Sequence, residues 1–255
     1  MNIRQSQLLE LLEKNSRVSV EEIKRKFNVS EMTVRRDFAL LESMGYADKV
    51  QGGIAARRRL FFDSSYSQRE SRHVDEKKAI AKKAVELIRP GEKIILDTGT
   101  TTLYIARELV KREVVLTVAT TSLAAAGVLY NSNIEVLIFG GFLRREIPDL
   151  IGPLTEKNLQ GFHAHKLFMG CDGVMVEEGF YTSDLNISHI EEIMVCIADK
   201  VIVVTDSSKF GRKSFVKYAD ISRIHTIITD SGISPGYAGR LEEKGVEVIE
   251  AEVLS

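Results

Sequence analysis

The 255-residue chain contains only two cysteines, Cys171 and Cys196. Two cysteines cannot build the dense disulfide framework of small secreted domains, so the sequence excludes that class. The chain also has no apolar run that approaches the roughly 20 residues of a membrane-spanning helix, and its polar first residues do not resemble a signal peptide. We therefore expect a cytoplasmic protein with no membrane partner.

The charges are distributed unevenly along the chain, although the formal net charge is only −1. Residues 1–59 hold 12 lysines and arginines against 8 aspartates and glutamates, a net charge of +4, whereas the remaining residues hold 23 against 28, a net charge of −5. The length leaves room for two domains. A basic N-terminal part on an acidic body suits a DNA-binding domain joined to a small-molecule domain.

The stretch 19–54 predicts two short helices, a tight turn and a hairpin. Ser19, with Glu22 three residues later, is a capping-box signature for the start of the first helix. Asn28 and Val29 form the predicted turn, and a preceding helix over residues 2–15 carries Leu8, Leu11 and Leu12 on its apolar stripe. The apolar face of the first short helix comprises Val20, Ile23 and Phe27.

The second short helix has the features of a DNA-recognition helix. Ser30 can cap its N-terminus, and the short polar first turn is followed by Arg35 and Arg36. In a helix-turn-helix this end of the second helix meets base edges, and arginine can bond guanine or grip a phosphate. The alternative is an ordinary amphipathic helix with a solvated arginine face. The buried stripe is predicted to comprise Val34, Phe38 and Leu41.

A hairpin over residues 47–56, turning at Gly52-Gly53, is predicted to form a wing beside the recognition helix. Such a wing would lie along the DNA backbone or in the minor groove. The residues that we expect to contact DNA are Ser30, Met32, Thr33, Arg35, Arg36, Lys49, Gln51, Gly52 and Gly53.

The spacing S-x-x-TVRRD-x-x-x-L-x-x-x-G, from Ser30 to Gly45 and followed by the two glycines, resembles the N-terminal signature of the DeoR-type transcriptional regulators. Phe38 stands where that family usually has leucine. Lys49 and Gln51 stand near positions where arginine and histidine are common, so backbone contacts are expected but base preference stays open. The resemblance implies a winged helix-turn-helix domain that binds a double-stranded DNA operator.

We predict domain boundaries at 1–57 for the DNA-binding domain, 58–74 for a linker and 75–255 for a larger domain. Arg57–Arg59 in the linker either contact phosphates or stay solvated. Phe61 and Phe62 are expected to dock on one of the domains, because two exposed phenylalanines would otherwise be unexplained.

From residue 75 onward, short apolar runs alternate with helix patterns, which predicts an α/β domain with a mostly parallel sheet. Helices are expected at 76–88, 101–110, 123–129, 153–159, 190–198 and 235–244. Strands are expected at 93–96, 114–119, 134–139, 166–169, 201–205, 226–229 and 247–249.

Small, hydroxyl-bearing and charged residues follow five of the predicted strands. In open parallel sheets, ligands bind outside the carboxyl ends of the strands, so these residues predict one shared pocket. The loop that enters the helix at residue 101 offers backbone amides and hydroxyls to a phosphate, and Lys209 adds positive charge. The residues that we expect to bind this ligand are Asp97, Thr98, Gly99, Thr100, Thr101, Thr102, Thr121, Ser122, Gly140, Gly141, Asp172 and Lys209.

The segments DTGTT, GG, GCDG and DSSKFG, which begin at Asp97, Gly140, Gly170 and Asp206, resemble the effector domain of the same family. That domain is itself similar to ribose-5-phosphate isomerases. The resemblance implies a repressor of sugar catabolism genes that leaves its operator when a phosphorylated sugar binds. Because operators are commonly two-fold, a dimer or tetramer is expected.

The main alternative is a sugar-phosphate isomerase that carries a DNA-binding module. Such chemistry needs a carboxylate base beside the substrate, but Asp172-Gly173 is followed by apolar residues, and Glu177 and Glu178 come only at a turn. We therefore expect no catalysis. The segment Tyr181–Asp184 either closes over the pocket or is a plain loop.

The remaining candidate residues do not indicate a metal or a cofactor. His163 and His165 stand without further ligands at metal-binding spacing, and Cys171 is expected to be a small buried residue. Arg144 and Arg145 either reach a ligand anion or stay solvated.

Overall fold

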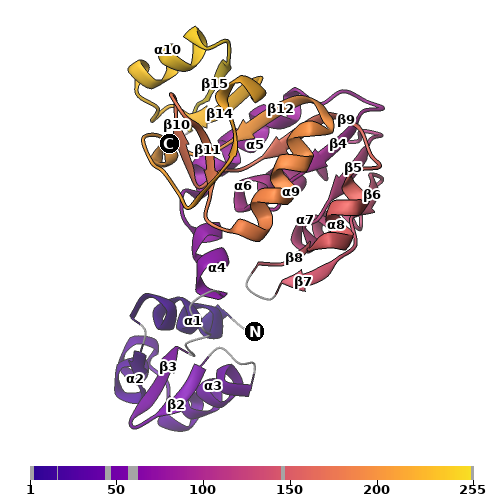
Figure 1. Ribbon diagram of the computed structural model, residues 1–255. Coiled ribbons are helices and arrows are strands. Elements are labelled where there is room, and N and C mark those ends of the chain that lie inside the picture. The colour runs from indigo at the N-terminus through magenta and orange to yellow at the C-terminus, as the bar shows by residue number, and fades with distance from the viewer. Residues whose placement is uncertain (1–2, 16, 44–46, 57–62, 145–146, 254–255) are drawn as a thin grey trace. The chain divides into compact units, whose positions relative to one another are not determined.

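The computed structural model describes residues 3–15, 17–43, 47–56, 63–144 and 147–253, and the chain forms two compact units, 1–61 and 62–255 (Figure 1). The predicted residues Gly45, Arg57–Arg59, Phe61, Phe62 and Arg145 lie outside the described part. Each unit has its own apolar core. The two units confirm the predicted fold class, a small helix-turn-helix unit followed by a larger α/β unit.

The N-terminal unit consists of three helices and a small antiparallel sheet with the strand order β1-β3-β2. Asn28 ends the first short helix in the left-handed conformation at φ 50°, which produces the predicted turn. Leu8, Leu12 and Val34 are fully buried between the helices. The elements are α1 (Ile3–Asn15), β1 (Arg17–Ser19), α2 (Val20–Phe27), α3 (Glu31–Ser43), β2 (Ala47–Val50) and β3 (Gly53–Ala56).

Asp37, the acidic residue of the TVRRD segment, joins α3 to α1. Its carboxylate accepts hydrogen bonds from Arg4 Nε at 2.8 Å and Gln5 Nε2 at 2.9 Å. Burial raises the pKa of Asp37, but the bonds from Arg4 and Gln5 outweigh this effect and leave the pKa below its ordinary value. The side chain is 3% exposed, so we interpret Asp37 as a structural anchor for α3 and not as a DNA contact.

The larger unit is built on a seven-stranded sheet with the order β15-β14-β12-β9-β4-β5-β6, in which all neighbouring strands run parallel. Its strands are β4 (Lys93–Leu96), β5 (Thr117–Thr120), β6 (Glu135–Ile138), β9 (Ala164–Met169), β12 (Ala198–Val204), β14 (Thr226–Asp230) and β15 (Glu247–Ala251). Its covering helices are α5 (Val74–Glu86), α6 (Thr100–Leu109), α7 (Leu123–Leu129), α8 (Pro153–Leu159), α9 (Leu185–Cys196) and α10 (Pro235–Glu243).

Helices cover both faces of this sheet, because its strands are apolar on both sides. Ile94 and Leu96 pack with α5, α6 and α7 on one face, whereas Ile95 packs with α8, α9 and α10 on the other. The alternation follows from the two-residue period of a strand. The predicted parallel sheet with two helical layers is thus confirmed.

The chain reverses its direction across the sheet between β4 and β9. From β4 it proceeds outward through β5 to β6, and then it returns to the other side of β4 with β9 and continues through β12. The loops after β4 and β9 therefore diverge, which opens a crevice at the carboxyl edge of the sheet.

Several elements were not predicted from the sequence. The predicted linker 58–74 contains a helix, and helix α9 begins at Leu185 instead of residue 190 because Asp184 caps it by accepting a hydrogen bond from the Asn186 amide at 2.8 Å. The other additions are short strands with little periodicity. They are β7 (Phe142–Arg144), β8 (Asp149–Ile151), β10 (Gly173–Met175), β11 (Gly179–Thr182) and β13 (Val216–Ala219), together with β1 of the N-terminal unit, while the added helix is α4 (Asp63–Ser71).

Candidate functional site

The first candidate site is the exposed surface of α3. Ser30 Oγ accepts a hydrogen bond from the Thr33 amide at 3.3 Å and lies 2.9 Å from Thr33 Oγ1, so Ser30 caps the helix as predicted. Met32 is 81% exposed, and Arg35 and Arg36 are exposed one turn further along. This surface presents hydroxyls, one apolar side chain and two guanidinium groups, which are groups that contact base edges and phosphates in a major groove.

Arg35 is held by Glu31, whose Oε1 lies 2.7 Å from Arg35 Nη2. The bond from Arg35 lowers the pKa of Glu31. Exposed pairs of this kind contribute little to stability, so Arg35 can exchange Glu31 for a phosphate or a base at small cost.

The predicted wing is present, but its turn lies one residue earlier than expected. Val50 pairs with Gly53, so Gln51 and Gly52 form the turn, with Gly52 at φ 80°. A Cβ on Gly53 would lie 2.1 Å from the Val18 carbonyl oxygen. Gly53 therefore allows β3 to approach β1, while Lys49 and Gln51 are exposed on the wing.

Arg17 is a basic residue beside the wing that was not predicted as part of the site. Its Nη2 donates to the Gln51 carbonyl oxygen at 2.7 Å, so the guanidinium lies at the wing turn. Its position depends on the pairing of β1 with β3, which the sequence did not reveal.

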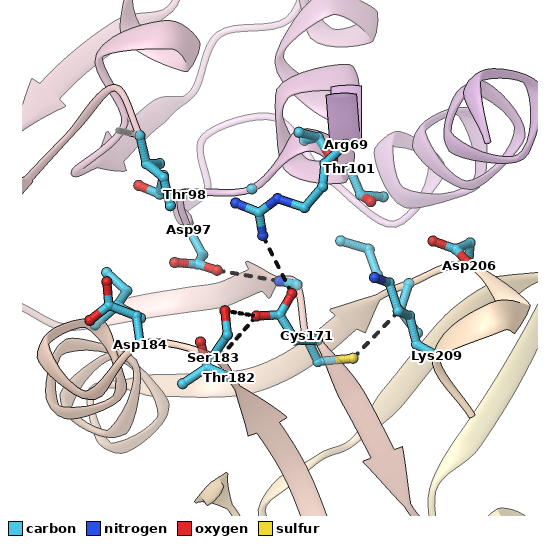
Figure 2. Close-up of a pocket in the computed structure, with 18 of the residues that line it drawn as sticks. Arg69, Asp97, Thr98, Thr101, Cys171, Thr182, Ser183, Asp184, Asp206 and Lys209 are labelled. Atoms are coloured by element: carbon cyan, nitrogen blue, oxygen red, sulfur yellow. Dashed lines mark hydrogen bonds and ion pairs between the residues drawn. The ribbon is translucent and has the colours of Figure 1, made fainter. Parts of the chain in front are cut away.

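The second candidate site is a cavity of about 190 Å³ at the carboxyl edge of the large sheet, where the loops after β4, β9 and β12 meet (Figure 2). Most of the predicted ligand-binding residues come together here. Those that line the cavity are Asp97, Thr98, Gly99, Thr100, Thr101, Asp172 and Lys209.

The other predicted residues lie behind this lining and hold its loops. Thr102 Oγ1 donates to the carbonyl oxygens of Asp97 at 2.7 Å and Gly99 at 2.9 Å. Thr121 Oγ1 lies 2.9 Å from Thr98 Oγ1, and Ser122 caps α7 by accepting from the Ala125 amide at 3.2 Å.

Gly140 and Gly141 belong to a tight contact between the β6 loop and α8. The Gly140 carbonyl oxygen accepts a hydrogen bond from Thr155 Oγ1 at 2.9 Å. A Cβ on Gly141 would lie 2.0 Å from the same oxygen of Thr155. Gly141 therefore permits this close packing, and neither glycine lines the cavity.

The loop after β4 leads into α6 and can hold an anion. Gly99 is the N-cap residue of this helix and provides no side-chain hydrogen bond to it. The first amides of α6 are thus available to a ligand, and the positive end of the helix dipole favours a phosphate there. Thr98, Thr100 and Thr101 add hydroxyls around the same position.

Lys77 is a buried cation of the cavity that sequence reasoning missed. Its Nζ donates to the carbonyl oxygens of Arg69 and of Arg72, the latter at 2.6 Å, which fixes the end of α4. Burial lowers the pKa of Lys77 to about 8. A signal was present, since Lys77 lies on the buried stripe of α5 three residues before Ile80, where an apolar side chain is expected.

Arg69, also missed, reaches the cavity from α4. Its Nη1 lies 3.4 Å from Asp172 Oδ1, while Asp172 Oδ2 accepts hydrogen bonds from the amide and hydroxyl of Ser183 at 2.9 and 2.6 Å (Figure 2). The segment predicted as a linker therefore contributes a side chain to the cavity.

Arg144 is neither solvated nor free to meet a ligand anion. Its guanidinium forms ion pairs with Asp184 and with Asp149, and Arg144 Nε lies 2.9 Å from Asp149 Oδ1. Burial alone would lower the pKa of Arg144, but the two carboxylates raise it above its ordinary value. Arg144 therefore joins the β7–β8 hairpin to the first turn of α9.

Two buried carboxyl groups of the cavity each keep one oxygen without a hydrogen-bond partner among the described residues, Asp97 Oδ1 and Glu191 Oε2. Asp97 Oδ2 accepts from the Gly170 amide at 3.3 Å. Burial raises the pKa of Asp97 to about 6. Burial also raises the pKa of Glu191 well above its ordinary value, and the nearby Asp97 and Asp172 raise it further.

The segment Tyr181–Asp184 is neither a lid nor a plain loop. Tyr181 and Thr182 belong to β11, which pairs with β10 and β13, and Asp184 caps α9. Thr182, Ser183 and Asp184 nevertheless line the cavity. A period of two over four residues was too short to identify this strand.

The carboxylates that could have supported catalysis lie away from the cavity. Glu177 pairs with Arg240 and Lys244 at 2.7 Å, and Glu178 pairs with Lys213 at 2.6 Å. Burial raises the pKa of Cys171 to about 12, which leaves the thiol protonated at neutral pH and inactive as a nucleophile.

The histidines considered as metal ligands have separate partners. His163 Nε2 lies 2.9 Å from Asp199 Oδ1, whereas His165 Nδ1 accepts from the Lys93 amide at 3.0 Å. Within the described ranges, no three His, Cys, Asp or Glu side chains are grouped to hold a metal ion. In the same part of the chain, no helix has the length and apolar character to cross a membrane.

Comparison with known proteins matches both units to one family. Residues 4–59 match the DeoR-like helix-turn-helix domain, and residues 72–231 match the DeoR C terminal sensor domain. A protein of Escherichia coli O157:H7, whose name assigns it to repression of the aga operon, is 36% identical over 96% of this chain and 92% of its own length. The uncharacterized HTH-type transcriptional regulator YulB of Bacillus subtilis is 35% identical over 96% of this chain and 95% of its own length.

Among solved structures, ribose 5-phosphate isomerase A of Methanocaldococcus jannaschii is 25% identical to the chain. The superposition covers 52% of this chain and 53% of the isomerase with a TM-score of 0.39. That score is too low to carry an argument about chemistry.

Proposed function

The chain belongs to the DeoR family of transcriptional regulators, and from this premise we propose that it is a repressor of sugar catabolism genes that a phosphorylated sugar releases from its operator. The family is one of DNA-binding regulators and not of enzymes. Double-stranded DNA and a phosphorylated sugar are the two partners of this proposal, and its setting is the cytoplasm.

The observation that supports the ligand class most strongly is the cavity at the carboxyl edge of the sheet. Its lining combines the N-terminus of α6 with three threonine hydroxyls and, from η1 (Ser207–Lys209), the ammonium of Lys209. These groups suit a phosphate. Asp172 can accept hydrogen bonds from sugar hydroxyls, and a cavity of about 190 Å³ suits one monosaccharide, since drug-sized sites span about 300–1,000 Å³.

DNA binding in this proposal uses α3 and the wing. Thr33, Arg35 and Arg36 contact bases or phosphates in the major groove, while Lys49 and the wing turn contact the backbone. Because the operator is expected to be two-fold, the protein binds it as a dimer or tetramer. Exposed apolar side chains on β7 and α9, among them Phe142 and Leu185, offer surface for such assembly.

Helix α4 is the element through which we expect the ligand to control DNA binding. It follows the N-terminal unit in the chain, and it belongs to the larger unit through Arg69–Asp172 and through the ion pair between Arg107 and Glu70 at 2.5 Å. A ligand that binds Asp172 or Lys77 competes for the contacts that hold α4. The ligand thereby binds the protein with different affinities when α4 is held by these contacts and when it is released. Coupling between ligand binding and DNA binding requires such a difference.

The test is operator binding in the presence of sugar phosphates. An operator selected from random duplex DNA is labelled and titrated with the protein, and a panel of phosphorylated monosaccharides is added to the complex. We expect at least one member to weaken binding roughly 5- to 150-fold and its unphosphorylated counterpart to have no effect. A protein that binds no duplex specifically, or that no phosphorylated sugar releases, contradicts the proposal.

A further inference from the structure

The proposed phosphate site leaves the buried acidic part of the cavity unexplained. Asp97 and Glu191 are 2% and 5% exposed, and both line the cavity. Within the part of the chain that the structure describes, Asp97 Oδ1 and Glu191 Oε2 have no hydrogen-bond partner. Buried carboxylate oxygens without a donor are strongly unfavourable, so a ligand that supplies donors there gains affinity.

The nearby cations of the cavity are engaged with other groups. Arg144 is paired with Asp149 and Asp184. Arg69 is paired with Asp172, and the Lys77 ammonium is bonded to carbonyl oxygens at the end of α4. Among the described residues, no ion pair therefore involves Asp97 or Glu191, and burial raises the pKa of both carboxyl groups.

Lys209 of the anion site and Asp97 lie on different sides of the cavity, whereas Thr98 lies beside Asp97 (Figure 2). Figure 2 shows Lys209 and Asp97 on opposite sides of the view, with Cys171 between them. One monosaccharide can therefore place its phosphate near the first turn of α6 and another substituent against the carboxyl groups. The two ends of the ligand then meet opposite charges.

From this arrangement we infer that the ligand is a phosphorylated amino sugar, whose ammonium group binds between Asp97 and Glu191 while its phosphate binds at the N-terminus of α6. This inference rests on the proposed function and specifies its ligand. A primary ammonium brings three donors and one positive charge, which favours the ionised forms of Asp97 and Glu191, whereas a hydroxyl brings one donor and no charge. Charge-assisted hydrogen bonds are also the stronger kind.

Matched ligands test this inference without any mutation. Glucosamine 6-phosphate, glucose 6-phosphate and N-acetylglucosamine 6-phosphate differ only at one ring substituent, and the three galactose counterparts cover the other common stereochemistry. Isothermal titration of the full chain at pH 7 measures each dissociation constant. In at least one series we expect the dissociation constant of the amino sugar to be at least about tenfold lower than those of its hydroxyl and acetylated counterparts. One hydrogen bond to a charged group contributes enough free energy for a tenfold ratio.

Variants on α9 assign the preference to Glu191. Glu191→Gln keeps the shape of the side chain but cannot ionise beside an ammonium group, so it is expected to reduce the affinity for the amino sugar phosphate about tenfold and to leave the hydroxyl counterpart within about twofold. Glu192→Gln is the control, because Glu192 is the exposed neighbour on the same helix, and its affinities should equal those of the wild type. Circular dichroism checks that each variant is folded.

Three outcomes overturn the inference. Equal or tighter binding of the neutral sugar phosphates, or an amino-sugar preference that persists in Glu191→Gln, rejects the ammonium site but leaves the proposed function intact. If none of the six compounds binds, the inference also fails. Ribose 5-phosphate and fructose 1-phosphate are then titrated, and their binding preserves the proposed function, whereas their failure to bind counts against both.

Discussion

At the scale of single residues, the unpaired carboxyl of Asp97 should reduce the stability of the ligand-free protein. Its pKa rises from an ordinary 3.8 to about 6 on folding because the group is buried, although the backbone amides of Thr98 and Gly170 lower the pKa. A raised pKa means that the folded state binds the proton more tightly, so stability increases as the pH falls from above 6 toward 4. Because each unit of pKa shift corresponds to 1.36 kcal/mol, the buried carboxylate lowers the free energy of unfolding at neutral pH by roughly 3 kcal/mol.

Asp97→Asn should therefore stabilise the ligand-free protein above pH 6 and have little effect near pH 4. The amide oxygen of asparagine can still accept the bond from Gly170. Thermal melting of both proteins at pH 8 and pH 4.5 measures the difference. An increase in melting temperature that is equal at both pH values would contradict the prediction. The increase should appear only where Asp97 is ionised, since it comes from removing that charge.

Individual site residues were predictable where they followed a strand and unpredictable where they lay inside a helix. Asp97, Thr98 and Asp172 stand in polar loops after apolar runs, and the parallel sheet brings such loops together. Glu191 and Lys77 stand beside other charged residues in helical patterns, where charged residues usually face solvent. Only the packing of α5 and α9 against the sheet reveals that they face the cavity.

At the scale of secondary-structure elements, α4 is expected to carry the coupling between ligand and DNA. Arg69→Met removes the ion pair with Asp172 but keeps much of the length of the side chain. We expect operator affinity without ligand to stay within about threefold of wild type, while the change in operator affinity caused by a saturating ligand falls by about tenfold.

The measurement for α4 is the ratio of operator dissociation constants with and without ligand, at a ligand concentration that saturates each protein. Gln68→Ala is the control, since Gln68 is exposed on the same helix. A variant that binds the ligand and responds to it as the wild type does would exclude Arg69 from the coupling.

The recognition helix leads to a second prediction at this scale. Arg35→Ala and Arg36→Ala should each reduce the free energy of operator binding by about 1–3 kcal/mol if the arginine contacts a base, and the loss should be specific to the operator sequence. Lys82→Ala is the control, because it removes one exposed positive charge from α5 in the other unit.

Fluorescence anisotropy with operator and scrambled duplexes measures this loss. An arginine that contacts only phosphate would weaken both duplexes equally and reduce the salt dependence of binding by about one charge. Wild-type operator affinity in the double variant, with the fold intact, would exclude α3 as the recognition helix.

Elements with a clear apolar period were predicted well, and short or polar elements were not. Helices α7 and α8 lie at their predicted residues, 123–129 and 153–159. Helix α4 has a mostly polar sequence, and it is fixed by the buried Tyr66 and by Lys77. The strands β7, β8 and β10 have three residues each, which is too short for a period of two to be recognised.

At the scale of the whole molecule, the order of the strands explains why one chain can sense a small molecule. The reversal between β4 and β9 opens the crevice, and α6 directs its N-terminus into it. The sequence predicted the alternation of strands and helices and the polar strand ends. It could not predict the order of the strands across the sheet, because non-local pairing depends on packing that no local pattern encodes.

The central claim is that a phosphate at the N-terminus of α6 releases the protein from its operator. The most direct measurement titrates operator complexes of wild type and of the double variant Thr100→Val, Thr101→Val with the sugar phosphate found by screening. Thr117→Val serves as the control, since its hydroxyl bonds Glu135 at the opposite edge of the sheet, 2.7 Å away.

The account predicts that the double variant binds operator as the wild type does but needs at least about tenfold more ligand for release, since it loses two hydroxyl donors to the phosphate. Thr117→Val should respond as the wild type. Release of the double variant at the same ligand concentration as wild type would contradict the claim and would require the phosphate to bind elsewhere in the chain.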